Sequence, residues 1–191
     1  MVKNKVSFGR RLKDRRFFRN ENLILDIFVC NSDITTKKIA KKAKLSRSTI
    51  YVHHHAVKEI IPDYERYILS SFSSAIKKKL HQKTVHLKSL YLEMLLFVLR
   101  NKKIFKMFIK FDNREIIVKM VGKLESKIIG TLRLPQKSQK IFKVYASEIT
   151  EVIFAWGHAG FPEDKLNQTL SDIMYLTNTY WDRLAPINHE Y

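Results

Sequence analysis

Hydrophobic residues recur at intervals of three and four along almost all of the 191-residue chain, which is the spacing of amphipathic helices. Strict alternation of apolar and polar residues is rare, and no Asn-Gly or Asp-Gly hairpin signal occurs. The clearest stripe repeats at every fourth residue and consists of Tyr64, Ile68, Phe72, Ile76 and Leu80. The pattern therefore predicts an all-α protein.

Breaks in this pattern predict where the helices begin and end. Three helices are expected first, at about 16–30, 36–43 and 47–53, with Thr35 and Ser46 as N-caps of the second and third. A long helix that begins at Val57 or Pro62 and ends near Leu80 is expected to link two domains. The helices that follow are expected at about 83–100, 101–111, 113–132, 138–157 and 163–184, with a clear break at Leu134-Pro135-Gln136.

We accordingly divide the chain into three parts. Residues 1–15 form a basic arm that the sequence predicts to be weakly structured, with cations at Lys3, Lys5, Arg10, Arg11, Lys13 and Arg15. Residues 16–60 are predicted to form a compact three-helix domain, and residues 61–191 a second, helical domain.

The formal net charge of +18 points to a polyanionic partner, either nucleic acid or an anionic surface. The charge is uneven, because residues 1–60 hold 15 basic and 5 acidic residues. The only cysteine, Cys30, lies in an apolar run, and we interpret it as a buried thiol in a reducing cytoplasm. No apolar segment is long enough to span a bilayer and the N-terminus lacks the apolar part of a signal peptide, so we expect a cytoplasmic protein without membrane association.

The segment Ile34–His55 carries the most specific pattern, ITTKKIAKKAKLSRSTIYVHHH. It predicts a short helix, a tight turn and a second short helix that opens with small polar and basic residues, which is a helix-turn-helix. Arg47 could donate two hydrogen bonds to guanine, and Ser46 with the free N–H groups of the helix start could bind phosphate. Tyr51 and His53 are expected on the side of Arg47, within reach of phosphates.

This segment resembles the DNA-binding region of the TetR family of bacterial transcriptional regulators. The residues that carry the resemblance are Ile39-Ala40, Ala43, Ser46-Arg47-Ser48-Thr49, Tyr51 and His53. A weaker likeness to a C-terminal subgroup rests on Trp156 and Gly160. The resemblance implies a homodimer whose N-terminal helices bind double-stranded DNA at a near-palindromic operator. It also implies that the C-terminal helices dimerise and often hold a small-molecule effector, so that the protein would be a repressor released or modulated by that effector.

We expect the DNA-contacting residues to be Thr35, Thr36, Lys37, Ser46, Arg47, Ser48, Thr49, Tyr51, His53 and Lys58. Three positions depart from the family pattern. Lys44 occupies a turn position where the family often has Gly, and a left-handed backbone there would cost about 1–2 kcal/mol. His54 replaces an aromatic residue, and Val57 replaces a phosphate-contacting Lys, for which the adjacent Lys58 is expected to substitute.

Other kinds of site find little support in the sequence. His53, His54 and His55 cannot close on one metal ion because neighbouring helical residues point about 100° apart, so no metal or other cofactor is expected. No catalytic motif occurs, and we expect no enzymatic activity and no catalytic residues. Burial of His54 would disfavour its charged form and would make DNA binding sensitive to pH.

The C-terminal half leaves two interpretations open. Its aromatic residues are Tyr91, Phe97, Phe105, Phe108, Phe142, Tyr145, Phe154, Trp156, Tyr175 and Trp181, and they could form plain core or line an effector cavity. Lysines 102, 103, 106 and 110 could be a solvated face or a site for an acidic small-molecule or protein effector. For the whole chain, the alternatives are a basic architectural DNA-binding or protein-interaction protein without operator selectivity, and a peripheral membrane protein.

Overall fold

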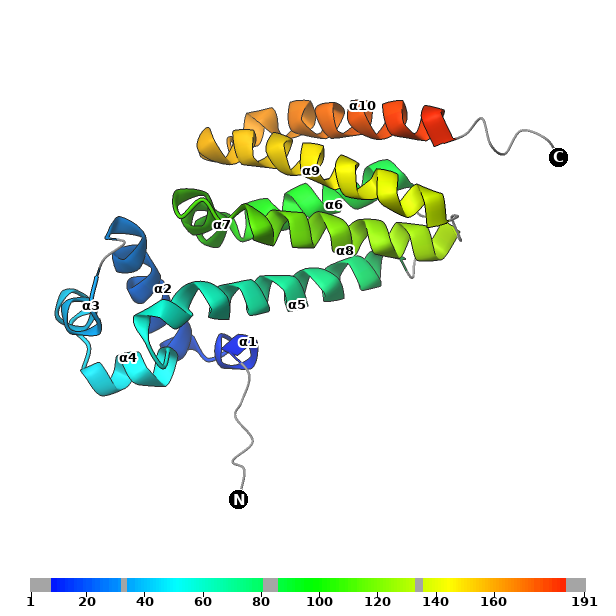
Figure 1. Cartoon of the computed structure of the whole chain (residues 1–191). Helices are drawn as coiled ribbons and strands as arrows, with labels where there is room; N and C mark the ends of the chain where they lie inside the picture. The colour runs from blue at the N-terminus through cyan, green and yellow to red at the C-terminus, as the bar shows by residue number, and fades with distance from the viewer. Residues whose placement is uncertain (1–7, 32–33, 81–85, 133–135, 185–191) are drawn as a thin grey trace, which may run out of the picture. The chain divides into compact units, whose positions relative to one another are not determined.

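The computed structural model describes residues 8–31, 34–80, 86–132 and 136–184, and every regular element in those ranges is helical (Figure 1). The prediction of an all-α protein is therefore confirmed. Within the described ranges no helix is both long enough and apolar enough to cross a membrane. Lys3 and Lys5 of the basic arm, the break at Leu134-Pro135 and the predicted helix start at residue 83 lie outside these ranges.

The chain divides into two compact units, Met1–Ile68 and Leu69–Tyr191. The division falls inside the long helix α5 (Ile60–Leu80), whereas the sequence placed the boundary at its start. The predicted helix start at Val57 corresponds to a 3₁₀ turn, Val57–Glu59, that leads directly into α5. Pro62 lies in the first turn of α5, where its missing N–H leaves no helical bond unmade.

The first unit is built from α1 (Phe8–Arg11), α2 (Arg15–Cys30), α3 (Thr36–Ala43), α4 (Arg47–His53) and the beginning of α5. Helices α2, α3 and α4 pack on one another. Their inward faces supply the apolar core, which includes Ile24, Leu25, Phe28, Ile39 and Ile50. Ile24 and Leu25 precede Phe28 by four and three residues in α2, and Ile39 and Ala40 precede Ala43 by the same intervals in α3, so the amphipathic pattern explains why these helices pack together.

Side-chain caps fix the starts of the three main helices of this unit. The Asp14 carboxylate accepts from Phe17 N at 2.8 Å, and Thr35 Oγ1 accepts from Lys38 N at 3.4 Å. Ser46 Oγ accepts from Thr49 N at 3.0 Å and so begins α4. The predicted spans 36–43 and 47–53, with their two N-caps, are thereby confirmed.

One prediction for this unit is wrong, and one element was not predicted. The described part of the arm contains a short helix, Phe8–Arg11, whose Phe8 ring lies edge-on to Tyr64 at a centroid distance of 5.3 Å. The wrong prediction concerns Cys30. Cys30 is exposed rather than buried, because it is the last residue of α2 and falls off the apolar stripe that includes Phe28.

The second unit contains the rest of α5 with α6 (Leu87–Arg100), α7 (Lys102–Lys110), α8 (Arg114–Leu132), α9 (Gln136–His158) and α10 (Leu166–Leu184). A 3₁₀ turn, Glu163–Lys165, precedes α10. Helix α9 packs against α7, α8 and α10, and α10 also packs against α6 (Figure 1). Gly157 allows α9 and α7 to approach closely, because a Cβ atom there would lie 2.5 Å from Ile109 Cδ1.

Most described aromatic residues of this unit are core. Tyr91, Phe97, Phe105, Phe108, Tyr145, Phe154 and Trp156 are buried. Tyr175 is not, since 73% of its surface is exposed on α10. The side chains of Phe142 and Trp181 lie outside the described part.

One carboxyl group is buried in the second unit without compensation. Glu125 on α8 is 3% exposed, and its Oε1 has no hydrogen-bond partner among the described residues. Burial raises the pKa of Glu125 to about 8, because the charged form loses its hydration. Glu125 is therefore mostly protonated at neutral pH.

Candidate nucleic-acid interface

Helix α4 presents an exposed polar face near its N-terminus. Arg47, Ser48 and Tyr51 are all exposed, and Tyr51 retains 51% of its accessible surface. Arg47 and Tyr51 are four residues apart and so lie one above the other on one side of the helix. Val52, 60% exposed, extends the accessible surface beyond the polar residues.

The hydroxyl groups at the start of α4 form a small network. Ser46 Oγ lies 2.7 Å from Ser48 Oγ and 2.8 Å from Thr49 Oγ1. Ser46 Oγ also accepts from the backbone N–H of Thr49. The backbone N–H groups of the helical residues before Thr49 are not capped by Ser46. The helix start therefore offers donors, and the hydroxyls beside it can accept or donate.

The charged side chains of α3, α4 and the residues beside them are basic. Between residues 34 and 58 the chain has no acidic residue. The basic residues of this stretch are Lys37, Lys38, Lys41, Lys42, Lys44, Arg47 and Lys58, and all of them are exposed. Such a surface favours a polyanion by long-range electrostatics.

The turn between α3 and α4 is tight and left-handed. Lys44 has φ 54° and ψ 39°, and Leu45 N donates to Ala40 O at 2.9 Å, which closes the end of α3. Lys44 is thus left-handed, which is the condition under which a lysine in place of a glycine costs about 1–2 kcal/mol. Because Ile39 and Ile50 are buried on either side of the turn, α4 is braced by α3.

The structure contradicts the expectation that His53 contacts phosphate. Its ring is 3% exposed and stacks on Phe17 at a centroid distance of 3.9 Å. Its Nδ1 lies 2.6 Å from Glu21 Oε2. The error is geometric: a residue six positions after Arg47 is rotated by about 240° from it around the helix, and therefore lies on the inward face.

Glu21 of α2 is the centre of a buried polar cluster that the sequence did not reveal; we call Glu21, His53, His54, Asp63 and Tyr64 the Glu21 cluster. Glu21 Oε1 accepts from the Tyr64 hydroxyl at 2.8 Å and lies 2.7 Å from His54 Nε2. One carboxylate thus joins α2 to the C-terminal end of α4 and to α5. A sequence signal existed, because position 21 falls on the same face as the core residues Ile24, Leu25 and Phe28.

His54 is held as an imidazolium by two carboxylates. Its Nε2 faces Glu21 and its Nδ1 lies 2.7 Å from Asp63 Oδ2, so a neutral ring would leave one nitrogen without a proton to donate. Burial lowers the pKa of His54, but Glu21 and Asp63 outweigh burial and raise it. This reverses the expected disfavouring of the charged form. The stabilisation from charged His54 is complete below its unfolded pKa and is lost as pH rises through the raised folded pKa.

The charge of Glu21 is stabilised in the same way. Burial raises the pKa of Glu21, but hydrogen bonds from His53, His54 and Tyr64 outweigh it and lower the pKa to about 2. The pKa of Tyr64 is raised, first by burial and then by the adjacent Glu21 carboxylate. The cluster therefore contains a stable ion pair at neutral pH.

Arg11 of the basic arm also contacts the end of α4. It donates to the carbonyl of Val52, and its guanidinium lies 5.0 Å from the centroid of the Phe17 ring. Arg11 therefore binds the protein itself.

The remaining predicted residues divide by exposure. Thr35, Lys37, Ser46, Arg47, Ser48, Tyr51 and Lys58 are exposed, and Thr36 and Thr49 are half-buried. Arg47, Ser48 and Tyr51 are brought together on α4, while Thr35 and Lys37 flank the start of α3. Among the described residues no group of His, Cys, Asp or Glu side chains is arranged to hold a metal ion.

Comparison with known protein families, with curated proteins and with solved structures finds no significant match to this chain.

Proposed function

We propose that this protein is a transcriptional regulator of the TetR type that binds a near-palindromic operator as a homodimer. In this proposal α3 and α4 form the helix-turn-helix, and α4 enters the major groove of double-stranded DNA with Arg47 toward the base edges. Two copies of α4 would then read half-sites about 34–36 Å apart. The protein acts as a repressor that an effector releases or modulates.

The observation that carries the proposal is the exposed N-terminal face of α4 inside a cationic surface. Arg47, Ser48 and Tyr51 offer a guanidinium and hydroxyls, the groups that recognise guanine and phosphate. No carboxylate between residues 34 and 58 opposes them. The burial of Ile39 and Ile50 supports a rigid presentation of this face.

Support for the homodimer comes from α10. Tyr175 exposes 73% of a large, partly apolar side chain on that helix, which a second copy could cover. The resemblance to the TetR family likewise implies that the C-terminal helices form the dimer contact. Sedimentation equilibrium of the full chain would measure the oligomeric state directly.

The alternative is a basic architectural protein that binds DNA without sequence selectivity, which the net charge of +18 favours on its own. Competition binding with a randomised duplex library separates the two functions. A regulator should enrich one motif with dyad symmetry. Binding without enrichment would support the architectural function and overturn the proposal.

Two variants test the role of Arg47 once a motif is known. Arg47→Ala should weaken binding to the motif by about tenfold or more while changing affinity for random DNA much less, because a bidentate guanine contact is worth about 1–3 kcal/mol. The matched control is Lys38→Ala on α3, which also removes one exposed cation. Lys38→Ala should weaken both kinds of DNA equally and reduce the salt dependence. Equal losses for Arg47→Ala on both kinds of DNA would refute base recognition.

A further inference from the structure

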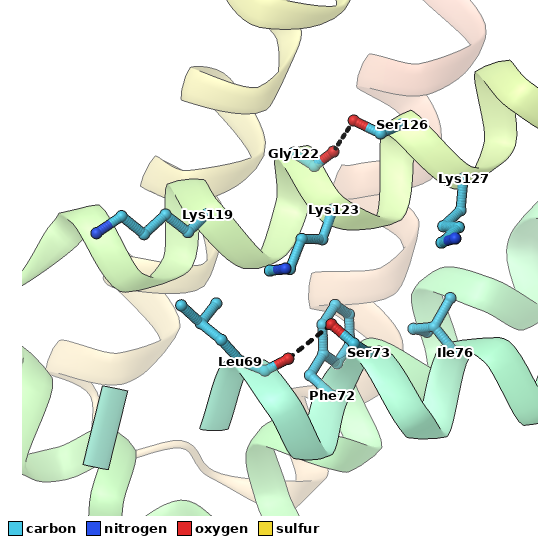
Figure 2. A pocket seen from close by; sticks show the side chains of 9 residues that line it. All are labelled: Leu69, Phe72, Ser73, Ile76, Lys119, Gly122, Lys123, Ser126 and Lys127. Atoms are coloured by element: carbon cyan, nitrogen blue, oxygen red, sulfur yellow. Dashed lines mark hydrogen bonds between the residues drawn. The ribbon is translucent and has the colours of Figure 1, made fainter. Parts of the chain in front are cut away.

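A cavity of about 430 Å³ lies between α5 and α8 in the second unit (Figure 2). Its size is within the range of small-molecule sites, roughly 300–1,000 Å³. The cavity is lined by Leu69, Phe72, Ser73 and Ile76 of α5 and by Lys119, Gly122, Lys123, Ser126 and Lys127 of α8. The two walls differ sharply in chemistry.

The α5 wall is apolar and well fixed. Phe72 is fully buried and Ile76 is 2% exposed, and Leu69 completes this side one turn before Phe72. Phe72 also packs edge-on against Phe97 of α6, with ring centroids 5.3 Å apart. Because Phe72 and Ile76 have almost no accessible surface, a ligand would touch the apolar part of this wall mainly at Leu69, which is half-buried.

The α8 wall is cationic. Lys119, Lys123 and Lys127 follow one another at intervals of four and so lie along one side of the helix, and no acidic residue lines the cavity. Lys119 Nζ is paired with Glu115 at 2.8 Å. No described carboxylate pairs with Lys123, whose amine lies between the two helices in Figure 2. Lys123 is therefore the residue best placed to receive an anion.

The serine hydroxyls in the cavity are already used as donors within their own helices. Ser73 Oγ donates to Leu69 O and Ser126 Oγ donates to Gly122 O, each at 2.7 Å. They can accept a hydrogen bond but have no proton left for a ligand. Recognition of a negative group consequently falls to the lysines.

Gly122 keeps the cavity open. A Cβ atom built on it would have no neighbour within 4 Å. The absence of a side chain at this position leaves space on the α8 wall directly beside Lys123. We expect a larger side chain at position 122 to occupy part of this space.

We propose that the cavity binds one amphipathic anion, an elongated apolar molecule with a single acidic head. The apolar part lies along the α5 wall at Leu69, and the head pairs with the Lys123 ammonium. A cation is excluded by the three lysines, and a neutral molecule of the same length gains only the apolar contacts. The role of this ligand as the effector of the regulator rests on the proposed function, whereas its binding to the cavity does not.

Calorimetric titration of the full chain, without DNA, tests the ligand class with three probes of equal length below their micelle concentrations. The probes are dodecanoate, dodecan-1-ol and dodecyltrimethylammonium. Dodecanoate should bind with one-to-one stoichiometry per chain and at least tenfold more tightly than either of the others. Equal affinity for the three probes, or no saturable binding of dodecanoate, would overturn the proposal.

Two pairs of variants place the ligand in this cavity. Gly122→Leu should reduce dodecanoate affinity by more than tenfold, whereas Gly122→Ala should leave most of it, because only the larger side chain fills the space. Lys123→Met should remove most of the preference for dodecanoate over dodecan-1-ol. Lys106→Met, which removes an exposed lysine of α7 in the same unit, should not. Circular dichroism would verify that each variant is folded.

The outcomes also separate this inference from the proposed function. Dodecanoate binding that is abolished by Gly122→Leu stands even if the randomised library yields no motif. Dodecanoate binding that is equally sensitive to Lys106→Met would show attraction to overall charge and would refute the site.

Discussion

Replacing Glu21 by Gln should destabilise the first unit by several kcal/mol, although the two side chains have almost the same size. The Glu21 carboxylate accepts from Tyr64 and pairs with His53 and His54 while 1% exposed. The amide of Gln would have one oxygen instead of two and would turn an NH₂ group toward a ring nitrogen that also donates. His54 would lose one of its two counter-charges in a buried place.

The structure gives the magnitude in two ways. A carboxyl group whose pKa falls from 4.5 to about 2 gains about 3 kcal/mol from folding when it is charged. Removing one partner of a buried ion pair costs about 3–5 kcal/mol in other proteins. We therefore expect a loss of about 3–5 kcal/mol at pH 7. The loss should shrink as pH falls from 4.5 toward 2, because the unfolded parent chain then binds a proton at Glu21 while the folded parent does so only near pH 2.

The assay must report on the first unit alone. Both tryptophans, Trp156 and Trp181, belong to the second unit, so their fluorescence follows that unit and serves as the internal control. Hydrogen exchange at the amide of His54, which donates to Ile50 O at 2.8 Å, measures the free energy of opening at the end of α4. Glu21→Gln should reduce that free energy of opening and leave unchanged the unfolding of the second unit, as followed by tryptophan fluorescence.

A double-mutant cycle between Glu21→Gln and His54→Gln would isolate their pair. Because the two side chains share a direct contact, the coupling should exceed about 1 kcal/mol. A loss below about 1 kcal/mol for Glu21→Gln, or an equal loss at pH 7 and pH 3, would refute the argument that a charged Glu21 joins these helices.

Three other substitutions test single features of the fold. Lys44→Gly should raise the free energy of opening of the first unit, measured by hydrogen exchange, by about 1 kcal/mol, because φ is 54° at this position. The control Lys41→Gly, inside α3, should lower that free energy by a similar amount. Gly157→Ala should lower the free energy of unfolding of the second unit, measured by tryptophan fluorescence, by about 1–3 kcal/mol, because the new Cβ atom would overlap Ile109. An unchanged free energy of unfolding would show that α7 moves freely. Glu125→Gln should stabilise the second unit by a few kcal/mol at pH 8 and hardly at all at pH 4. The reason is that the parent protein loses stability as pH rises from 4.5 through the pKa of about 8. The same difference in stability at both pH values would contradict a neutral buried carboxyl group.

Local signals were sufficient for the longer helices of the first unit, although not for the four-residue α1. The spacing of Ile39, Ala40 and Ala43, with Thr35 before them and Lys44 after, defined α3 to the residue. These signals act within four or five residues, through N-caps, the 3.6-residue period and the left-handed turn, and they do not depend on the rest of the chain. The prediction of a cationic, exposed start of α4 likewise needed only the local order of residues.

The Glu21 cluster could not be predicted in this way. Glu21 and His53 are 32 positions apart, and only the packing of α2 on α4 brings them within 2.6 Å. From the sequence alone, His53 was predicted to face a partner, and burial was predicted to disfavour the charged form of His54. Tertiary structure decided both, because an ion pair depends on the distance between side chains in space and not on their order along the chain. The α5–α8 cavity was decided in the same way, since Phe72 and Lys123 become its opposite walls only when the two helices lie face to face.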